Sequence, residues 1–149
     1  MSWTITAAPQ GNWEGITSSS DGSKLAAVQN SGGYIYTSAN GGISWTSTSP
    51  AANWYFIASS NDGSKLAAVQ LGGYIYTSAS GGSSWTVTSA PQGYWQGIAS
   101  SGDGVYLAAV ANSGDTTYAS SYYIYTSSSG IIFIYYYLHC YYYHYILSL

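Results

Sequence analysis

A repeat of about 41 residues constrains this chain more than any other feature of its sequence. Residues 13–28 read WEGITSSSDGSKLAAV, residues 54–69 read WYFIASSNDGSKLAAV, and residues 95–110 read WQGIASSGDGVYLAAV. Trp13, Trp54 and Trp95 are separated by equal intervals of 41 residues. Such self-similarity is the signature of a repeat architecture, in which each unit buries its apolar faces against its neighbours.

Each unit divides into four predicted strands separated by turn residues. The first strand, Trp-x-x-Ile-x-Ser, ends before an Asp-Gly pair, whose Gly tolerates the positive φ of a hairpin turn. The third, Tyr-Ile-Tyr-Thr, alternates with the period of a pleated strand. No stretch has a helical period with caps. Four strands in about 41 residues predict an all-β fold of β-propeller blades. A β-sandwich is the alternative, but it does not require so strict a period.

The repeat predicts two segments: a partial β-propeller over residues 1–130 and a separate tyrosine-rich tail over residues 131–149. The first holds about three four-stranded antiparallel blades. Closed propellers contain roughly four to eight blades, so we expect an incomplete ring that needs self-association or further blades, and we favour a fragment of a longer protein.

The tail, IIFIYYYLHCYYYHYILSL, breaks the pattern abruptly after Gly130. If its codons end mostly in C, reading one base later turns Ile and Phe codons into Ser codons and Tyr and His codons into Thr codons. We therefore hypothesise that the tail is a frameshift product or a wrongly assigned gene end, and coding DNA without such an alternative frame would contradict this. His139, Cys140 and His144 are too few and too irregularly spaced for a metal site.

The charge content excludes several classes of partner. Charged residues make up 5% of the chain, against roughly 25% in a typical soluble domain. There is no Arg, the net charge is −3, and Lys24 and Lys65 are the only basic side chains. Nucleic-acid binding and docking to anionic membranes both need basic clusters, so neither is expected unless the tail itself contacts a membrane. The Ser-, Thr- and Gly-rich composition favours an extracellular or cell-surface protein, although we expect no signal peptide, and no cofactor is predicted.

The turn before each predicted fourth strand carries a recurring motif. In the first unit it consists of Ser38, Asn40, Gly42, Ser44 and Trp45, and in the second of Ser78, Ser80, Gly82, Ser84 and Trp85. The motif resembles that of the BNR or Asp-box repeat propellers, Ser/Thr-x-Asp-x-Gly-x-Thr-Trp, with Asn or Ser in the Asp position. This family includes sialidases, xyloglucan-cleaving glycosidases, sortilin-type receptors and Ycf48-type assembly factors. The resemblance implies a propeller fold and a structural role for the motif, away from any active site.

No catalytic residues are predicted. The resemblance to sialidases implies an arginine cluster, which a chain without Arg does not have, and other glycosidases need a pair of carboxylates. Asp21, Asp62 and Asp103 occupy the repeated turn, and only Glu14 and Asp115 remain. We therefore expect a non-enzymatic scaffold or recognition module that binds carbohydrate or protein at a cell surface. The alternatives are a fragment of an Asp-box glycoside hydrolase with its catalytic residues outside this chain, and a protein-assembly factor.

The candidate ligand-binding residues lie where the first strands begin and in one insertion. Trp13, Trp54 and Trp95 either stack against a ligand such as a sugar ring or pack between blades. The residues that follow them vary, and these are Glu14, Tyr55 and Gln96. The third unit carries an insertion near residues 112–121. Because loops on a rigid scaffold often hold binding residues, Asp115 and Tyr118 are further candidates.

Overall fold

The computed structural model describes residues 2–112, 122–128 and 131–135, which form twelve strands and no helix. Blade 1 consists of β1 (Trp13–Ser18), β2 (Leu25–Gln29), β3 (Ile35–Ser38) and β4 (Thr46–Ser47). Blade 2 consists of β5 (Trp54–Ser59), β6 (Leu66–Gly73), β7 (Ile75–Ser78) and β8 (Thr86–Val87). Blade 3 consists of β9 (Gly93–Ser100), β10 (Tyr106–Asn112), β11 (Tyr122–Ser128) and β12 (Ile131–Tyr135). None of these segments contains a helix long and apolar enough to cross a membrane.

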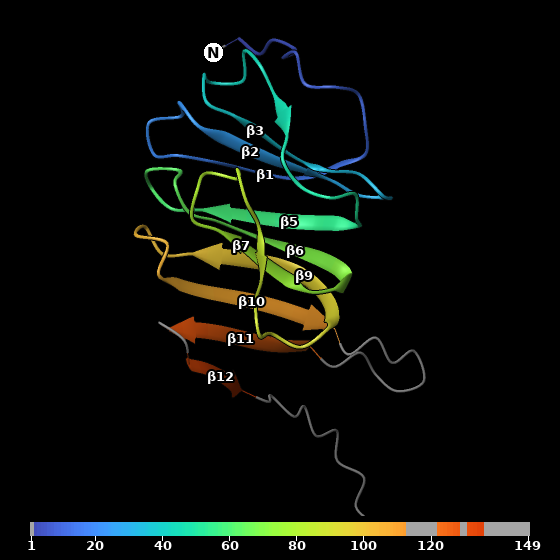
Figure 1. Cartoon of the computed structure of the whole chain (residues 1–149), viewed down its shortest axis with the longest axis vertical. Coiled ribbons are helices and arrows are strands. Elements are labelled where there is room, and N and C mark those ends of the chain that lie inside the picture. The colour runs from blue at the N-terminus through green and yellow to red at the C-terminus, as the bar shows by residue number, and fades with distance from the viewer. Residues whose placement is uncertain (1, 113–121, 129–130, 136–149) are drawn as a thin grey trace, which may run out of the picture.

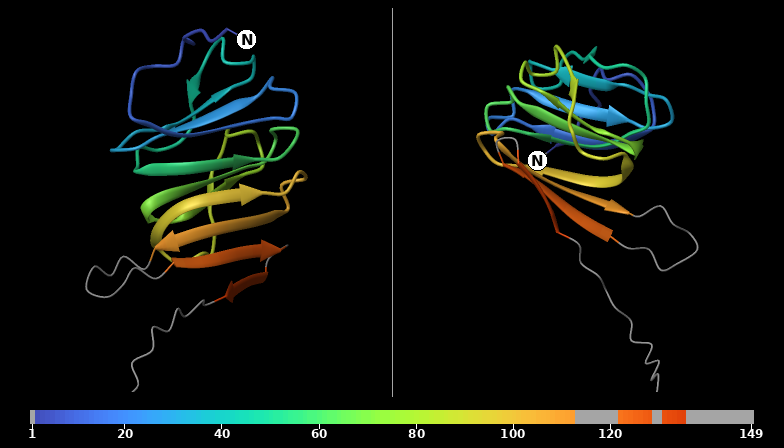
Figure 2. Two further views of the ribbon diagram at one scale, coloured as in Figure 1. Left: turned by 180° about the vertical axis from the view of Figure 1, so that it is seen from behind. Right: turned by 60° about the horizontal axis from the view of Figure 1, so that its bottom comes forward.

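Each blade is a four-stranded antiparallel sheet whose strands pair in chain order, which confirms the predicted architecture. The three blades follow one another along the long axis of the molecule (Figure 1). Blade 1 is a separate sheet, whereas the end of β6 also pairs with β9 through Leu71 and Tyr94 and so joins blades 2 and 3. Views from behind and from below show the same succession of sheets (Figure 2).

The fourth strand of blade 3 comes from the segment predicted to be a separate tail. Residues Ile131–Tyr135 form β12 and pair antiparallel with β11, with Ile134 opposite Tyr125. These residues are β-branched or aromatic, the types that favour strands. The predicted boundary at residue 130 therefore falls just before a strand of the third sheet. Residues 136–149 lie outside the described part of the chain.

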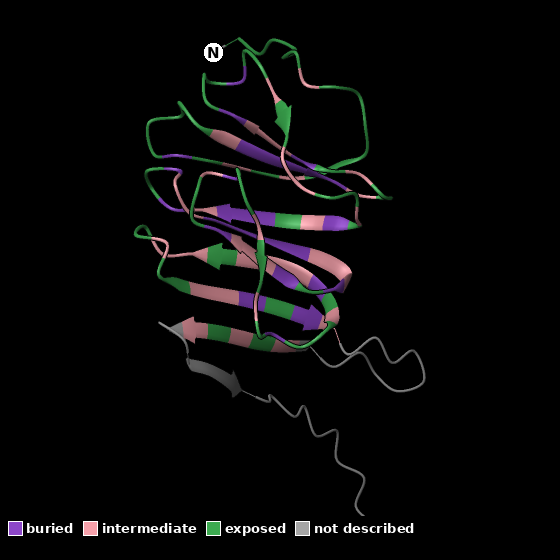
Figure 3. Ribbon diagram, in the orientation of Figure 1, coloured by how far each residue is buried: buried purple, intermediate pink, exposed green. Residues whose placement is uncertain are grey.

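The hydrophobic core is divided between two junctions, one for each pair of neighbouring blades. In the first, Ala26, Val28 and Ile35 of blade 1 face Trp54 and Ile57 of blade 2. The second is formed by the opposite face of blade 2, with Val69 and Ile75, and by Trp95 and Ala109 of blade 3. Buried residues therefore lie mainly on the strands that form the two junctions (Figure 3). Blade 2 therefore buries one face against blade 1 and the other against blade 3.

The Asp-Gly pairs lie in the turns between the first and second strands, as predicted. Gly22, Gly63 and Gly104 adopt φ angles of 72°, 67° and 69°. This left-handed backbone region favours glycine because it has no Cβ. The turns also contact one another between blades, since the Ser20 amide donates to the Asn61 carbonyl over 2.7 Å and the Asn61 amide donates to the Gly102 carbonyl over 2.7 Å.

Candidate functional site

The three tryptophans that begin the first strands differ in exposure. Trp54 and Trp95 are 0% exposed, whereas Trp13 in blade 1 is 36% exposed. The ring centroid of Trp54 lies 5.2 Å from that of Tyr76 in an edge-on arrangement, and Trp95 lies 4.7 Å from Tyr125 in the same way. A fully buried ring has no free face for a sugar, so of the two predicted roles, Trp54 and Trp95 fit packing between blades. Aromatic packing within the blade junctions accounts for their burial.

The residue after each of these tryptophans lies in a β-bulge. In β1 the pairing with β2 passes from Trp13 to Gly15 and skips Glu14. Equivalent shifts skip Tyr55 in β5 and Gln96 in β9. A bulge removes its extra residue from the hydrogen-bond ladder and changes the direction of the side chain, and bulges are frequent beside functional sites. The sequence singled out these three positions because they vary, but it gave no signal for the bulges.

The bulges lie in three strands that are adjacent across the blades, because β5 contacts both β1 and β9. We name the set of Glu14, Tyr55, Phe56 and Gln96, which lie on these three adjacent strands, the inner-strand patch. Phe56 is 42% exposed, and its ring centroid lies 6.2 Å from that of Tyr55. Glu14 is exposed and accepts a hydrogen bond of 3.3 Å from the Asn30 side chain. The patch thus combines a carboxylate, an aromatic pair and an amide.

Phe56 was not among the residues predicted from the sequence. The equivalent residues in the other two blades are Gly15 and Gly97, so blade 2 carries a large aromatic side chain where the repeat otherwise has none. This departure from the repeat could have identified Phe56 from the sequence.

The turn aspartates are held within their own turns. Asp21 accepts hydrogen bonds from the Ser19 hydroxyl over 2.6 Å and from the Ser23 amide over 3.0 Å, and these bonds lower its pKa to about 2. Bonds from Ser60 and Ser64 lower the pKa of Asp62 in the same way, and bonds from Ser101 and Val105 lower that of Asp103. Hydrogen bonds to a carboxylate favour its charged form. These aspartates are therefore ionised at neutral pH and fixed in structural positions.

The turns between the third and fourth strands are built from serine and asparagine side chains. The Ser38 hydroxyl accepts a bond of 2.9 Å from the Gly42 amide, and the Asn40 side-chain oxygen accepts one of 3.0 Å from the Ser44 amide. In blade 2, Ser78 and Ser80 accept the corresponding bonds from Gly82 and Ser84. Trp45 donates from Nε1 to the Gly42 carbonyl over 3.1 Å, whereas Nε1 of Trp85 is buried with no acceptor among the described residues. The motif therefore closes each turn on itself.

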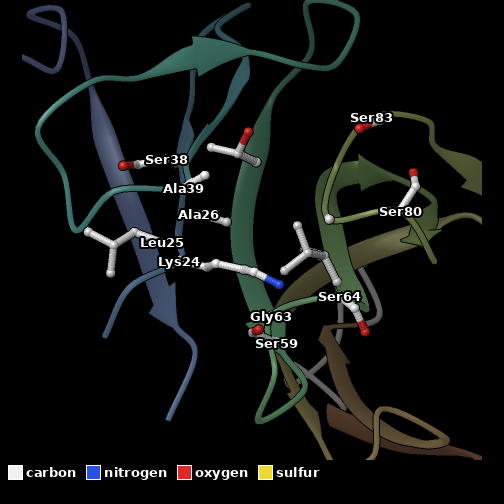
Figure 4. A pocket seen from close by; sticks show the side chains of 13 residues that line it. Lys24, Leu25, Ala26, Ser38, Ala39, Ser59, Gly63, Ser64, Ser80 and Ser83 are labelled. Carbon is white, nitrogen blue, oxygen red and sulfur yellow. The ribbon is translucent and has the colours of Figure 1, made fainter. Parts of the chain in front are cut away.

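A cleft of about 350 Å³ lies between blades 1 and 2, lined by Lys24, by Leu25 and Leu66, and by small residues that include Ser38, Ser64 and Ser80. Lys24 extends from blade 1 toward Gly63 (Figure 4) and donates from Nζ to the Asp62 carbonyl over 2.9 Å. A second cleft of about 250 Å³ repeats the arrangement between blades 2 and 3. There Lys65 donates to the Asp103 carbonyl over 2.9 Å. Because each lysine donates a hydrogen bond to the next blade, we assign both a structural role in holding neighbouring blades together.

Other candidates lie outside the described residues. They comprise Asp115 and Tyr118 in the insertion, and His139, Cys140 and His144 in the tail. Among the residues with described positions, no three His, Cys, Asp or Glu side chains are grouped so that they could hold a metal ion.

Four-stranded antiparallel blades whose first strands lie side by side define this chain as a set of β-propeller blades. No family model matches the sequence, and no curated protein matches it. Solved propeller structures do match the fold. A chain of the nidogen/laminin complex has a TM-score of 0.63 and 18% identity, over 82% of this chain and 47% of that one.

Two other matched propellers are a peptide-bound protein and an enzyme. Ycf48 bound to D1 peptide has a TM-score of 0.64 and 15% identity, over 85% of this chain and 41% of that one. The GH74 enzyme from Niastella koreensis has a TM-score of 0.60 and 19% identity, over 76% of this chain and 19% of that one. The chain therefore spans less than half the length of these structures, and at such low identity the likeness establishes the fold alone.

Proposed function

We propose that this chain is a non-enzymatic β-propeller scaffold that binds a segment of another protein at the inner-strand patch. The observation that carries the proposal is the set of three bulges. They lie at the same position in all three blades but present Glu14, Tyr55 and Gln96, three chemically different side chains. In a repeat protein, residues that recur in every unit are explained by the shared architecture. The residue in the bulge differs from blade to blade although the backbone geometry is the same, and this favours a role in recognition.

Burial of the tryptophans favours a protein ligand over a carbohydrate. Trp54 and Trp95 have no exposed face, and the Tyr55 ring also packs against the core of the second junction. Of the aromatic pair, Phe56 is the more exposed ring. An apolar ring between a carboxylate and an amide suits a peptide, whose backbone offers both donors and acceptors. A Ycf48 structure that contains a bound peptide is a precedent for this use of the fold.

The acidic residues favour a non-enzymatic role. A glycosidase needs one carboxyl group that holds its proton until it can protonate the leaving group. Asp21, Asp62 and Asp103 have pKa values lowered by hydrogen bonds, which makes them unsuitable as general acids near neutral pH. We also infer that the turns at residues 38–45 and 78–85 are degenerate Asp boxes with a structural role.

The test applies the labelled full chain to an array of linear peptides and to a glycan array. We expect it to capture a defined set of peptides. Phe56→Gly, which installs the residue found in the other two blades, and Glu14→Gln should each weaken that capture by about tenfold or more, the effect of losing an anchor residue. Tyr74→Ala is the matched control, because Tyr74 is a 39% exposed aromatic residue outside the patch.

Capture of glycans alone would overturn the choice of a protein ligand. Peptide capture that Tyr74→Ala and Phe56→Gly weaken equally would overturn the assignment of the patch. Release of reducing sugar from xyloglucan by the purified chain would favour the glycosidase alternative.

A further inference from the structure

The cleft between blades 1 and 2 contains hydrogen-bond donors that the fold does not use. The Lys24 ammonium group has three N–H donors. One of them bonds the Asp62 carbonyl over 2.9 Å, and the others have no acceptor within the described part of the chain. The hydroxyl groups of Thr37 and Ser83 also line the cleft, and neither makes a hydrogen bond to any residue that the structure describes. Holding the blades together therefore accounts for only one of the donors in this cleft.

An acceptor and an aliphatic surface line the same cleft. The Ser64 hydroxyl donates to the Asp62 carboxylate over 2.8 Å, which leaves the lone pairs of its oxygen able to accept a hydrogen bond. Leu25 and Leu66 add apolar side chains to the walls. A saccharide matches this set of groups, because each of its hydroxyls both donates and accepts, while its ring also carries C–H groups that can pack on leucine.

The charge around the cleft favours a neutral ligand over an anion. Asp62 lies on the turn that Lys24 contacts, and hydrogen bonds from Ser60 and Ser64 hold the pKa of Asp62 well below its usual value. The carboxylate is therefore ionised at neutral pH. An anion in the cleft would be attracted by Lys24 but repelled by Asp62. A neutral ligand accepts hydrogen bonds from the ammonium group without that repulsion.

We propose that this cleft binds one unit of a neutral saccharide, with Lys24, Thr37 and Ser83 as donors and Ser64 as an acceptor. Lys24 extends between the two blades, and Ser83 lies on a turn of blade 2 (Figure 4). The cleft volume of about 350 Å³ is at the lower end of the range for ligand sites, roughly 300–1,000 Å³. The cleft lies at the end of the blades that carries the Asp-Gly turns, whereas the inner-strand patch lies where the first strands begin. The two sites are therefore separate.

The cleft between blades 2 and 3 provides a comparison within the chain. Lys65 and Thr77 line it at the repeat positions of Lys24 and Thr37, but Val105 stands in the position of Ser64. Because valine has no hydroxyl to accept a hydrogen bond, we expect the same saccharide to bind more weakly there.

The test titrates the isotope-labelled full chain with glucose, galactose, mannose and N-acetylglucosamine and follows the backbone amides by NMR. We expect at least one sugar to shift the amides of Thr37 and Ser83, with a millimolar Kd. Thr37→Val and Ser83→Ile should each weaken that binding about fivefold, the effect of losing one hydrogen bond. Ser83→Ile installs the residue that blade 1 carries at the equivalent position. Ile43→Ser is its matched control, because Ile43 is exposed and does not line the cleft.

Glucuronate separates a neutral ligand from an anion, and we expect it to bind no more tightly than the neutral sugars. Absence of binding by all four sugars up to about 100 mM, which covers millimolar Kd values, would overturn the proposal. Equal weakening by Ser83→Ile and Ile43→Ser, or binding of glucuronate about tenfold tighter than that of every neutral sugar, would overturn it as well. Failure of peptide binding at the inner-strand patch would appear instead as absent capture on the peptide array, which these titrations do not measure.

Discussion

Trp54 and Trp95 form a matched pair, because they occupy equivalent repeat positions and are both 0% exposed. They differ in one hydrogen bond. Nε1 of Trp54 donates to the Pro50 carbonyl over 3.1 Å, whereas Nε1 of Trp95 is buried with no acceptor among the described residues. Replacing each with Phe removes a similar part of the ring and also removes the N–H group. The two substitutions should therefore differ in their effect on the free energy of unfolding only through the N–H group.

The difference can be estimated from its two parts. Loss of the smaller ring of the indole costs about 1 kcal/mol in either blade, from roughly 40 Å² of apolar surface. Trp54→Phe also loses a hydrogen bond with a net contribution of about 1 kcal/mol. Trp95→Phe instead removes a buried donor without a partner, which recovers about 1–3 kcal/mol. We therefore expect Trp54→Phe to lower the free energy of unfolding by about 2 kcal/mol, and Trp95→Phe to leave it unchanged or raise it by up to about 2 kcal/mol.

The assay is urea denaturation followed by circular dichroism, with the slope of the transition required to stay constant between variants. The turns between the third and fourth strands offer a second pair for the same contrast, because Nε1 of Trp45 has an acceptor and Nε1 of Trp85 has none in the described part of the chain. Equal destabilisation by Trp54→Phe and Trp95→Phe would refute the reasoning. It would mean that the indole N–H of Trp95 has a hydrogen-bond partner in the folded protein.

Two further predictions concern the turns. Gly82 has a φ of 96°, and a Cβ there would lie 2.7 Å from Thr37 Cγ2, whereas Gly22 has a φ of 72° with nothing within 4 Å. By the same denaturation assay, Gly22→Ala should lower the free energy of unfolding by about 1 kcal/mol, from backbone strain alone, and Gly82→Ala should lower it by about 3 kcal/mol. Equal losses would contradict the close approach of blades 1 and 2. The folded pKa of Asp21 is about 2, below its usual 3.8. The stabilisation from its ionised form should therefore be complete above about pH 4 and lost as the pH falls through about 2. Melting curves of wild type and Asp21→Asn should converge over that range, and a constant gap down to pH 2 would exclude this linkage.

Much of the fold could be predicted because the repeat supplies the same evidence three times. The Asp-Gly turns, the alternation in Tyr-Ile-Tyr-Thr and the 41-residue interval all indicate one four-stranded unit, and agreement between local and global signals is what makes a fold predictable. The fourth strand of blade 3 could not be predicted in this way. Ile131–Tyr135 pairs with β11 although it lacks the Ser-Trp-Thr signature. Backbone pairing needs a free sheet edge and a suitable strand, not a particular motif.

The candidate site was predicted by position but not by geometry. Variation at Glu14, Tyr55 and Gln96 is visible in the sequence, whereas the bulges depend on how each strand registers with its neighbour. The burial of Trp54 could not be told from sequence either, because the same residue type suits a stacking platform and a packed core.

Exposure in a repeat array depends on the position of a blade as well as on its sequence. Trp13 and Trp54 have the same aromatic partners within their blades, since Trp13 packs on Tyr36 and Trp45 just as Trp54 packs on Tyr76 and Trp85. Only Trp54 has a preceding blade against it, and only Trp54 is fully buried. A repeated sequence therefore specifies the chemistry of every junction but not how many junctions form. That number is decided by what stands at the two ends of the array.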